Sequence, residues 1–138
     1  MQDKKFLDSN IFIYAFSNQD IAKKNIASGL LLASEHTISI QVMNEVSNIM
    51  LRKLKLDNKD IKAFIEDAYS RYGVIEISRV TFLKACELRE NYNLSYYDSL
   101  IVSSALEAKC DILYSEDMQD KQKIENLTII NPFIELKE

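Results

Sequence analysis

Four acidic residues, far apart in this chain of 138 residues, are the side chains best suited to chemistry: Asp8, Glu45, Asp98 and Asp117. Asp8 closes a strand-like segment near the start of the chain, and Asp117 comes just after another such segment. In an open parallel sheet with helices on its faces, ligands bind outside the carboxyl ends of the strands, where the strand order reverses. We therefore expect Asp8 and Asp117 to meet at one edge of a sheet.

Glu45 and Asp98 are expected on helix faces that turn toward the core. Val42 and Ile49 flank Glu45 at helical spacing, so its side chain shares a face with apolar residues. Asp98 begins a strongly apolar helical segment, and no arginine or lysine occurs between positions 90 and 108 to compensate its charge locally. A bound cation would supply that compensation.

Carboxylates gathered in one place repel one another, which raises some of their pKa values when no cation is present. A magnesium ion removes this conflict because it prefers oxygen ligands. It also keeps several waters, which leaves positions for a phosphate and for an attacking hydroxide. The four acids therefore predict magnesium-dependent hydrolysis of a phosphodiester.

Each acid also has an ordinary structural explanation. Asp8 is well placed to cap the following helix, alone or with its neighbours, and Asp98 follows Ser95 with the spacing of a capping-box variant. Glu45 fits an acid at a helix edge, and Glu116–Asp117 fits a polar turn. Only the combination of the four favours a functional site.

Other reactive side chains fit structural roles better. His36 is the only histidine and has no identifiable nucleophile beside it, so we expect it on the surface or at a helix-to-strand junction. Cys86 and Cys110 occur singly, without a metal-binding spacing, so both are predicted to be buried thiols in a reducing cytoplasm.

Two further groups are more ambiguous. Arg52, Lys53 and Lys55 end a predicted helix, where cations interact favourably with the helix dipole, although they could also contact RNA phosphates. The adjacent Tyr96 and Tyr97 fit packing or a partner-facing surface better than a platform for stacked bases.

The chain alternates between strand-like and helix-like segments. Polar residues such as Ser9–Asn10, Asp20 and Asp57–Asn58 mark helix starts. We predict strands over 4–8, 37–40, 74–77, 111–114 and 127–130, and helices over 11–16, 20–33, 41–56, 59–72, 80–92 and 95–109, with a short helix over 118–124. This pattern indicates an α/β fold with a mainly parallel five-stranded sheet between two layers of helices.

Composition is consistent with one domain spanning residues 1–138. The chain is 47% hydrophobic and 28% charged, and two glycines and one proline disfavour an all-β fold. No apolar leader or membrane-length apolar run is visible, so we expect a soluble cytoplasmic protein with no membrane contact. The net charge of −4 argues against a broad basic surface for nucleic acid, unless the acids gather in one pocket and bind metal.

Four segments of the chain resemble the motifs of PIN-domain nucleases. Residues 6–15, FLDSNIFIYA, resemble the opening strand and turn of this family, with Asp8 as the first metal-binding acid. Residues 44–46, 97–105 and 113–119 resemble the second, third and fourth motifs, which carry Glu45, Asp98 and Asp117. The resemblance extends to residues 130–133. In its length and in the sequences of these motifs, the chain is similar to VapC toxins of toxin-antitoxin pairs.

This resemblance implies a three-layer α/β/α PIN-like fold and endonucleolytic cleavage of RNA with Mg²⁺ or Mn²⁺. It implies that Asp8 and Asp98 are the principal metal ligands, that Glu45 completes the site, and that Asp117 binds metal directly or through water. Asn10, Ser115 and Glu116 would support these acids. A small antitoxin and a second copy of the chain are the implied partners.

The fourth motif departs from the family pattern in one respect. A glycine often follows this motif in the family, whereas Asp120 and Lys121 follow it here. The choice of Asp117 over the adjacent Glu116 as the fourth acid therefore stays open.

Two alternative functions compete with the nuclease. One is a non-catalytic PIN-like module that binds RNA or protein and retains the acids for metal-dependent folding. The other is a phosphoacceptor receiver domain, which would have an acidic pair at the end of the first strand and a lysine after a later strand. The sequence has neither of these receiver features.

Overall fold

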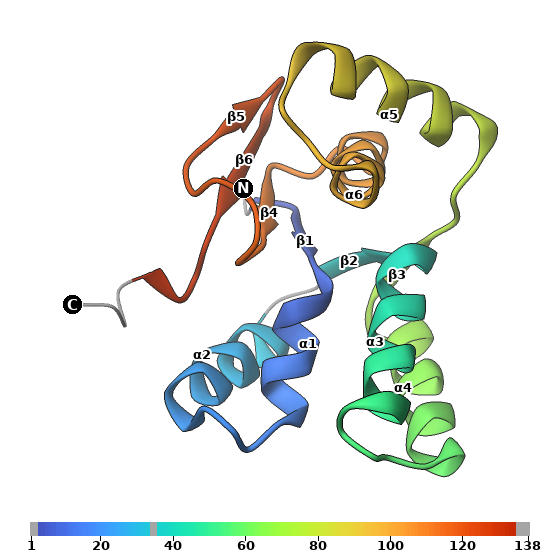
Figure 1. Cartoon of the computed structure of the whole chain (residues 1–138), viewed down its shortest axis with the longest axis vertical. Helices are drawn as coiled ribbons and strands as arrows, with labels where there is room; N and C mark the ends of the chain where they lie inside the picture. Colours follow the sequence, from blue (N-terminus) through green and yellow to red (C-terminus); the bar gives the residue numbers. More distant parts are fainter. Residues whose placement is uncertain (1–2, 34–35, 135–138) are drawn as a thin grey trace.

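A computed structural model describes residues 3–33 and 36–134, and shows helices packed around one six-stranded sheet (Figure 1). The helices are α1 (Ser9–Phe16), α2 (Ile21–Leu32), α3 (Ile40–Arg52), α4 (Asn58–Arg71), α5 (Arg79–Asn91) and α6 (Tyr96–Glu107). The strands are β1 (Lys5–Leu7), β2 (His36–Ser39), β3 (Gly73–Ile75), β4 (Ile112–Tyr114), β5 (Lys123–Ile124) and β6 (Leu127–Ile130).

The strand order is β3-β2-β1-β4-β6-β5, and every pair except β5–β6 is parallel. The order reverses between β1 and β4, because the chain moves outward from β1 to β3 and then returns to the other side of β1. The carboxyl ends of β1 and β4 therefore border the crevice where ligands bind in open α/β sheets.

Helix pairs cover the sheet, with α1 packed on α2, α3 on α4 and α5 on α6 (Figure 1). Polar residues that begin helices explain several boundaries. The Ser39 hydroxyl accepts a hydrogen bond from the Val42 amide at the start of α3, and Asp57 and Asp60 form a capping box at the start of α4. Short loops then return the chain to the next strand.

The predicted α/β fold with a mainly parallel sheet and six main helices is confirmed, but the sheet has six strands and not the predicted five, and two predicted helices need correction. The predicted short helix over 118–124 is wrong, because this segment forms turns and then β5, which pairs antiparallel with β6. Burial of Ile124 against the core accounts for this pairing. The predicted helix over 41–56 ends earlier, at Arg52, before Lys55 adopts a left-handed backbone conformation with φ 57°.

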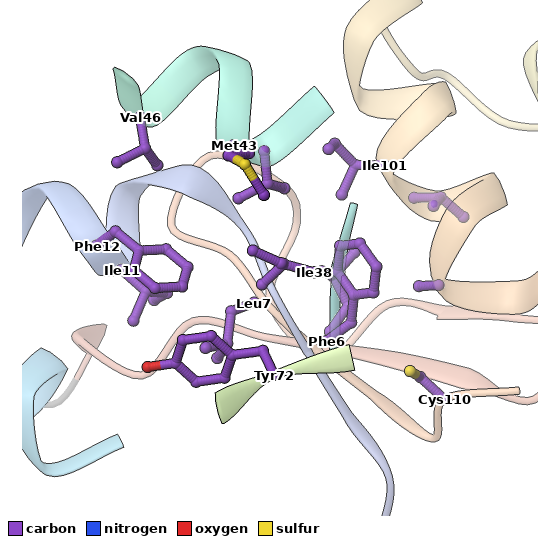
Figure 2. Close-up of a cluster of buried hydrophobic side chains, with 14 of the residues drawn as sticks. Phe6, Leu7, Ile11, Phe12, Ile38, Met43, Val46, Tyr72, Ile101 and Cys110 are labelled. Atoms are coloured by element: carbon purple, nitrogen blue, oxygen red, sulfur yellow. The ribbon is translucent and has the colours of Figure 1, made fainter. Parts of the chain in front are cut away.

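The core is made of aliphatic and aromatic side chains from both faces of the sheet. Phe6 and Leu7 of β1 are fully buried, as expected for a central strand covered on both faces. Figure 2 shows Ile11 of α1, Met43 of α3 and Ile101 of α6 converging on this strand. The central position of β1 in this core fixes the place of Asp8, the residue that follows it.

Phe12 of α1 connects separate parts of the fold through its ring. Its centroid lies 5.5 Å from that of Phe64 in α4 and 5.7 Å from that of Tyr72, both in edge-to-face geometry. It lies 6.3 Å from the ring of Phe16, one turn later in α1. Such aromatic pairs add to the free energy that burial alone provides.

One prediction about a single residue is wrong. Cys110 is buried as expected, but Cys86 is exposed on α5. His36 lies at the predicted helix-to-strand junction, at the start of β2, where it is buried. Its Nε2 is hydrogen-bonded to the Leu30 carbonyl, and burial lowers the pKa of His36. In the described part of the chain, no helix is long and apolar enough to cross a membrane.

The position of Phe12 gives a first prediction. Phe12→Ala should lower the free energy of unfolding by about 3–5 kcal/mol, because it leaves a cavity at the contact between α1 and α4. Phe16→Ala is the control, since its ring is 37% exposed and its loss should cost less. Urea denaturation followed by circular dichroism measures both values. Equal losses for the two variants would contradict the central role of Phe12.

Candidate active site

The backbone holds the ends of β1 and β4 side by side. Leu7 pairs with Tyr114, and the Asp8 amide continues the ladder by donating to the Tyr114 carbonyl at 3.0 Å. The amide of Ser115 in turn donates to the Ile130 carbonyl of β6 at 3.0 Å. Asp8 and Ser115 are therefore neighbours at the carboxyl edge of the sheet.

Asp8 is the most deeply placed of the four acids, with 4% of its surface exposed. It is the N-cap residue of α1, and its Oδ1 accepts a hydrogen bond from the Ser9 amide at 2.7 Å. Its Oδ2 accepts one from the Ser115 hydroxyl at 2.8 Å. The capping interpretation is thus correct, and it leaves both carboxylate oxygens held at the crevice.

The surroundings of Asp8 disfavour its negative charge. Burial raises the pKa of Asp8 to about 7, the hydrogen bonds from Ser9 and Ser115 lower it, and the charges of Glu45 and Asp98 raise it further. Structural caps on a surface are normally ionised at neutral pH, so a value this high marks Asp8 as a candidate functional group.

Glu45 joins Asp8 through a bridging serine. Its Oε2 accepts a hydrogen bond from the Ser9 hydroxyl at 2.9 Å, and the Ser9 amide is the group that binds Asp8. Its Oε1 accepts one from the Gln41 amide nitrogen at 2.9 Å, one turn earlier in α3. The carboxylate of Glu45 is therefore oriented from two sides.

Asp98 approaches the same edge from α6. A helix that returns the chain between parallel strands starts at their carboxyl edge, and Asp98 lies in the first turn of α6. The Ser95 hydroxyl accepts a hydrogen bond from the Asp98 amide at 3.2 Å, which is half of the predicted capping box. Burial raises the pKa of Asp98, a hydrogen bond with Ser95 lowers it, and the charges of Asp117 and Glu45 raise it.

Glu116 and Asp117 face different parts of the molecule. The Glu116 carboxylate pairs with Lys23 of α2 and accepts a hydrogen bond from the Tyr14 hydroxyl. The Asp117 carboxylate accepts a hydrogen bond from the Asn10 amide nitrogen at 3.3 Å. Asp117 also acts electrostatically on Asp98, so the structure places Asp117 with the other acids and Glu116 with α2.

The four acids form an electrostatic group, but not a closed metal cage. Within residues 3–33 and 36–134, no three Asp, Glu, His or Cys side chains come close enough together to hold a metal as they stand. Magnesium is commonly bound by one or two carboxylates together with water and phosphate, so a closed cage is not needed. The buried Oδ1 of Asn10 also lacks a hydrogen-bond partner. The all-oxygen donors and their unfavourable charge fit a hard divalent cation.

Sequence patterns alone did not reveal several residues that organise this site. Ser9 and Gln41 orient Glu45, while Tyr14 and Lys23 hold Glu116 away from the other acids. The i,i+4 spacing of Gln41 and Glu45 was a usable signal, because such residues are neighbours on a helix. The contact of Lys23 with Glu116 spans 93 residues and has no local sequence signature.

Solved structures with similar folds include a toxin and a toxin-antitoxin complex. A toxin-antitoxin complex from Klebsiella pneumoniae aligns with a TM-score of 0.70 and 21% identity over 94% of this chain and 98% of that one. VapBC2 from Rickettsia felis, bound to a promoter DNA fragment, aligns with a TM-score of 0.65 and 22% identity over 91% of this chain and 96% of that one. VapC20 from Mycobacterium tuberculosis is described as a toxin that cleaves the sarcin-ricin loop. It aligns with a TM-score of 0.67 and 15% identity over 83% of this chain and 90% of that one.

A comparison with curated proteins gives no match. At these identities, the solved structures show a shared fold, which is the α/β architecture with a mainly parallel central sheet described above. The family model of the PIN domain matches residues 5–123, so the match includes all four acids and most of the chain. The chain belongs to the PIN domain family.

Proposed function

We propose that this protein is a metal-dependent endoribonuclease and the toxin of a toxin-antitoxin pair. The observation that carries the proposal is Asp8, a buried carboxyl whose pKa is raised to about 7 while hydrogen bonds hold both of its oxygens at the crevice. Membership of the PIN domain family and the likeness in fold to RNA-cleaving and antitoxin-bound proteins support the assignment.

Asp8 and Asp98 are the proposed principal ligands of Mg²⁺ or Mn²⁺, with Glu45 completing the site and Asp117 acting directly or through water. When bound, the cation neutralises the acids, orients the phosphodiester and activates a water for in-line attack. No second candidate function is favoured by a specific observation.

The protein's own residues keep the acids in position before RNA arrives. Ser115 and the Ser9 amide fix the Asp8 oxygens, and the Ser9 hydroxyl together with Gln41 fixes Glu45. Asn10 holds Asp117. Because these donors occupy rigid elements, the carboxylates require little reorganisation when a phosphate binds.

The proposed partners are an RNA substrate, a small antitoxin and a second copy of this chain. The antitoxin is supported by the similar structures, three of which are described as toxin-antitoxin or VapBC complexes. The cytoplasm is the proposed location. A short neighbouring reading frame that encodes a DNA-binding antitoxin would support this part of the proposal.

The first test of the proposal replaces Asp8. Asp8→Asn keeps the size of the side chain and its cap acceptor but removes the charge, so RNA cleavage with Mg²⁺ should fall to background while the protein stays folded. Gel analysis of labelled structured and unstructured RNAs measures cleavage, with Asp67→Asn as an exposed control on α4. Intact RNA with the unaltered protein, where a positive-control nuclease cuts, would favour the non-catalytic alternative.

A second test separates the two neighbouring acids of the fourth motif. Asp117→Asn should reduce cleavage by about tenfold or more, since Asp117 acts with the other acids. Glu116→Gln should leave cleavage within about twofold and lower the free energy of unfolding by about 1–3 kcal/mol, because it weakens the charge-assisted contacts with Lys23 and Tyr14. The reverse pattern of activity would assign the fourth position to Glu116.

A third test uses the stability of the metal-free protein. Between about pH 4 and pH 7 the folded protein keeps a proton on Asp8 that the unfolded chain releases, so the free energy of unfolding falls as pH rises through this window. Asp8→Asn removes this loss. At pH 8 the variant should therefore be more stable than the unaltered protein by about 1–4 kcal/mol, and the gain should vanish near pH 4.

Chemical denaturation at the two pH values, with EDTA present, measures this difference. Adding Mg²⁺ at pH 8 should raise the melting temperature of the unaltered protein and of the Asp67→Asn control, but not that of Asp8→Asn. A variant less stable than the unaltered protein at pH 8 would show that the Asp8 charge is well accommodated without metal.

A further inference from the structure

An open hollow of about 400 Å³ lies directly beside the acids. It is lined by Gln41, Asn44, Glu45 and Asn48 of α3 and by Tyr97 of α6. Glu45 belongs to the proposed active site, and Tyr97 is the chain neighbour of Asp98. The hollow therefore adjoins the proposed active site, and its volume is in the range of about 300–1,000 Å³ found for small-ligand sites.

The amides that line this hollow form one stripe on α3. Gln41, Asn44 and Asn48 follow one another at spacings of three and four residues, which places them on the same helix face. The opposite face carries the buried side chains of α3, which are Val42, Met43, Val46 and Met50. The stripe is thus the face of α3 that is available to a ligand.

Asn44 and Asn48 are unusual residues for the middle of a helix. Asparagine favours caps and turns, and it stabilises a helix interior less than lysine, glutamate or alanine does. In the part of the chain that the structure describes, neither side chain forms a hydrogen bond, whereas Gln41 binds Glu45. Their amide donors and acceptors therefore remain free to bind a ligand.

An aromatic ring completes one wall of the hollow. Tyr97 is 60% exposed, and its ring meets the ring of Tyr96 edge-on, with centroids 5.3 Å apart. Tyr96 is itself covered by the Arg89 guanidinium at 5.0 Å, so the pair is supported from the side of α5. The ring of Tyr97 is thus supported from one side and accessible from the other.

A second hollow continues along the same helix toward its carboxyl end. It has a volume of about 360 Å³, is lined by Asn48, Ile49, Arg52 and Lys53, and shares Asn48 with the first. Neither Arg52 nor Lys53 forms a salt bridge in the described part of the chain. The acid Glu45, the amide Asn48 and the cation Arg52 therefore follow one another along about 10 Å of the α3 axis.

We propose that the first hollow binds the unpaired nucleobase next to the phosphodiester that is cut. The base stacks on Tyr97, and the amides of Asn44 and Asn48 bind its edge. Arg52 and Lys53 then contact the backbone phosphate that follows. This inference rests on the proposed nuclease function and adds the nucleotide that gives it sequence preference.

The chemistry of the lining favours a base over other ligands of RNA. Each amide offers both donors and an acceptor, which is the pattern that base edges require, and unpaired bases are commonly stacked on aromatic side chains. The lining of the first hollow contains no cation to bind a phosphate, and a second metal would find only one carboxylate there. The phosphate contacts belong instead to the cationic end of α3.

The first experiment sequences the cut sites in a pool of random RNA with Mg²⁺. The unaltered protein should prefer particular bases at the nucleotide beside the cut. Asn44→Ala combined with Asn48→Ala should reduce that preference about tenfold, and Tyr97→Ala should lower cleavage of all sequences, whereas Tyr97→Phe should retain it. Alanine is the better helix former, so loss of folding is not expected.

Matched controls lie away from the hollow. Tyr69→Ala removes a tyrosine that is 57% exposed on α4, and Asn126→Ala removes an exposed asparagine in the turn before β6. Both variants should keep the base preference and rate of the unaltered protein. An unchanged preference in the double asparagine variant would overturn the proposed base site while leaving the nuclease function intact.

The second experiment does not depend on cleavage. Random RNA that contains 5-iodouracil is irradiated with the Asp8→Asn protein, and the cross-linked peptide is identified by mass spectrometry. Cross-links at position 97 that persist in Asp8→Asn/Tyr97→Phe and disappear in Asp8→Asn/Tyr97→Ala would support stacking. If they form while the unaltered protein cuts no RNA, the base site stands and the nuclease function fails.

Cross-links that map only to other parts of the chain would overturn the base site whatever the cleavage result. A hollow that instead receives a protein partner would give this outcome, together with an unchanged base preference in the double asparagine variant.

Discussion

The pairing of β1 with β4 is the constraint on which the rest of the structure depends. Leu7 lies opposite Tyr114, and the next residue of each strand, Asp8 and Ser115, then meet at the carboxyl edge. Side chains alternate between the two faces of a sheet, so a slip of one residue would turn Asp8 to the opposite face. The apolar side chains of Phe6 and Leu7, both fully buried, make that slip costly and so protect the position of the acid.

The burial that fixes β1 also makes ionisation of Asp8 unfavourable. The nearest neutral groups, two serines, give Asp8 hydrogen bonds, but no cation contacts it in the described part of the chain. Lys23, the cation that contacts the segment after β4, is bound to Glu116. Proteins usually retain such an unfavourable arrangement where function requires it.

Sequence patterns predicted most of the fold because its strands are short apolar runs and its helices have amphipathic periods. β6 was predicted, but β5 was missed because the segment over 118–124 is mostly polar and only Ile124 in it is fully buried. Exposure of Cys86 depended on the rotation of α5 about its axis, which its weak amphipathic pattern does not fix.

The acids were predictable from their positions at strand ends and on helix faces, and Asn10 and Ser115 were expected to support them, as their hydrogen bonds to Asp117 and Asp8 now show. The other partners of the acids were not predictable. Ser9 was visible only as a possible cap, and nothing local distinguished Asp117 from Glu116. That distinction depends on the direction in which the backbone leaves β4 and on a contact with Lys23 from a distant helix. Such information exists only once the sheet has formed.

The segment after Asp117 shows how this chain forms a turn without glycine. Lys121 has φ 67°, a left-handed conformation that glycine adopts at lower cost, and the Asp120 carboxylate accepts a hydrogen bond from the Asn131 amide. The unfavourable conformation costs on the order of 1 kcal/mol. A search pattern that requires glycine after the fourth acid would therefore miss this chain, in which a lysine adopts the left-handed conformation there.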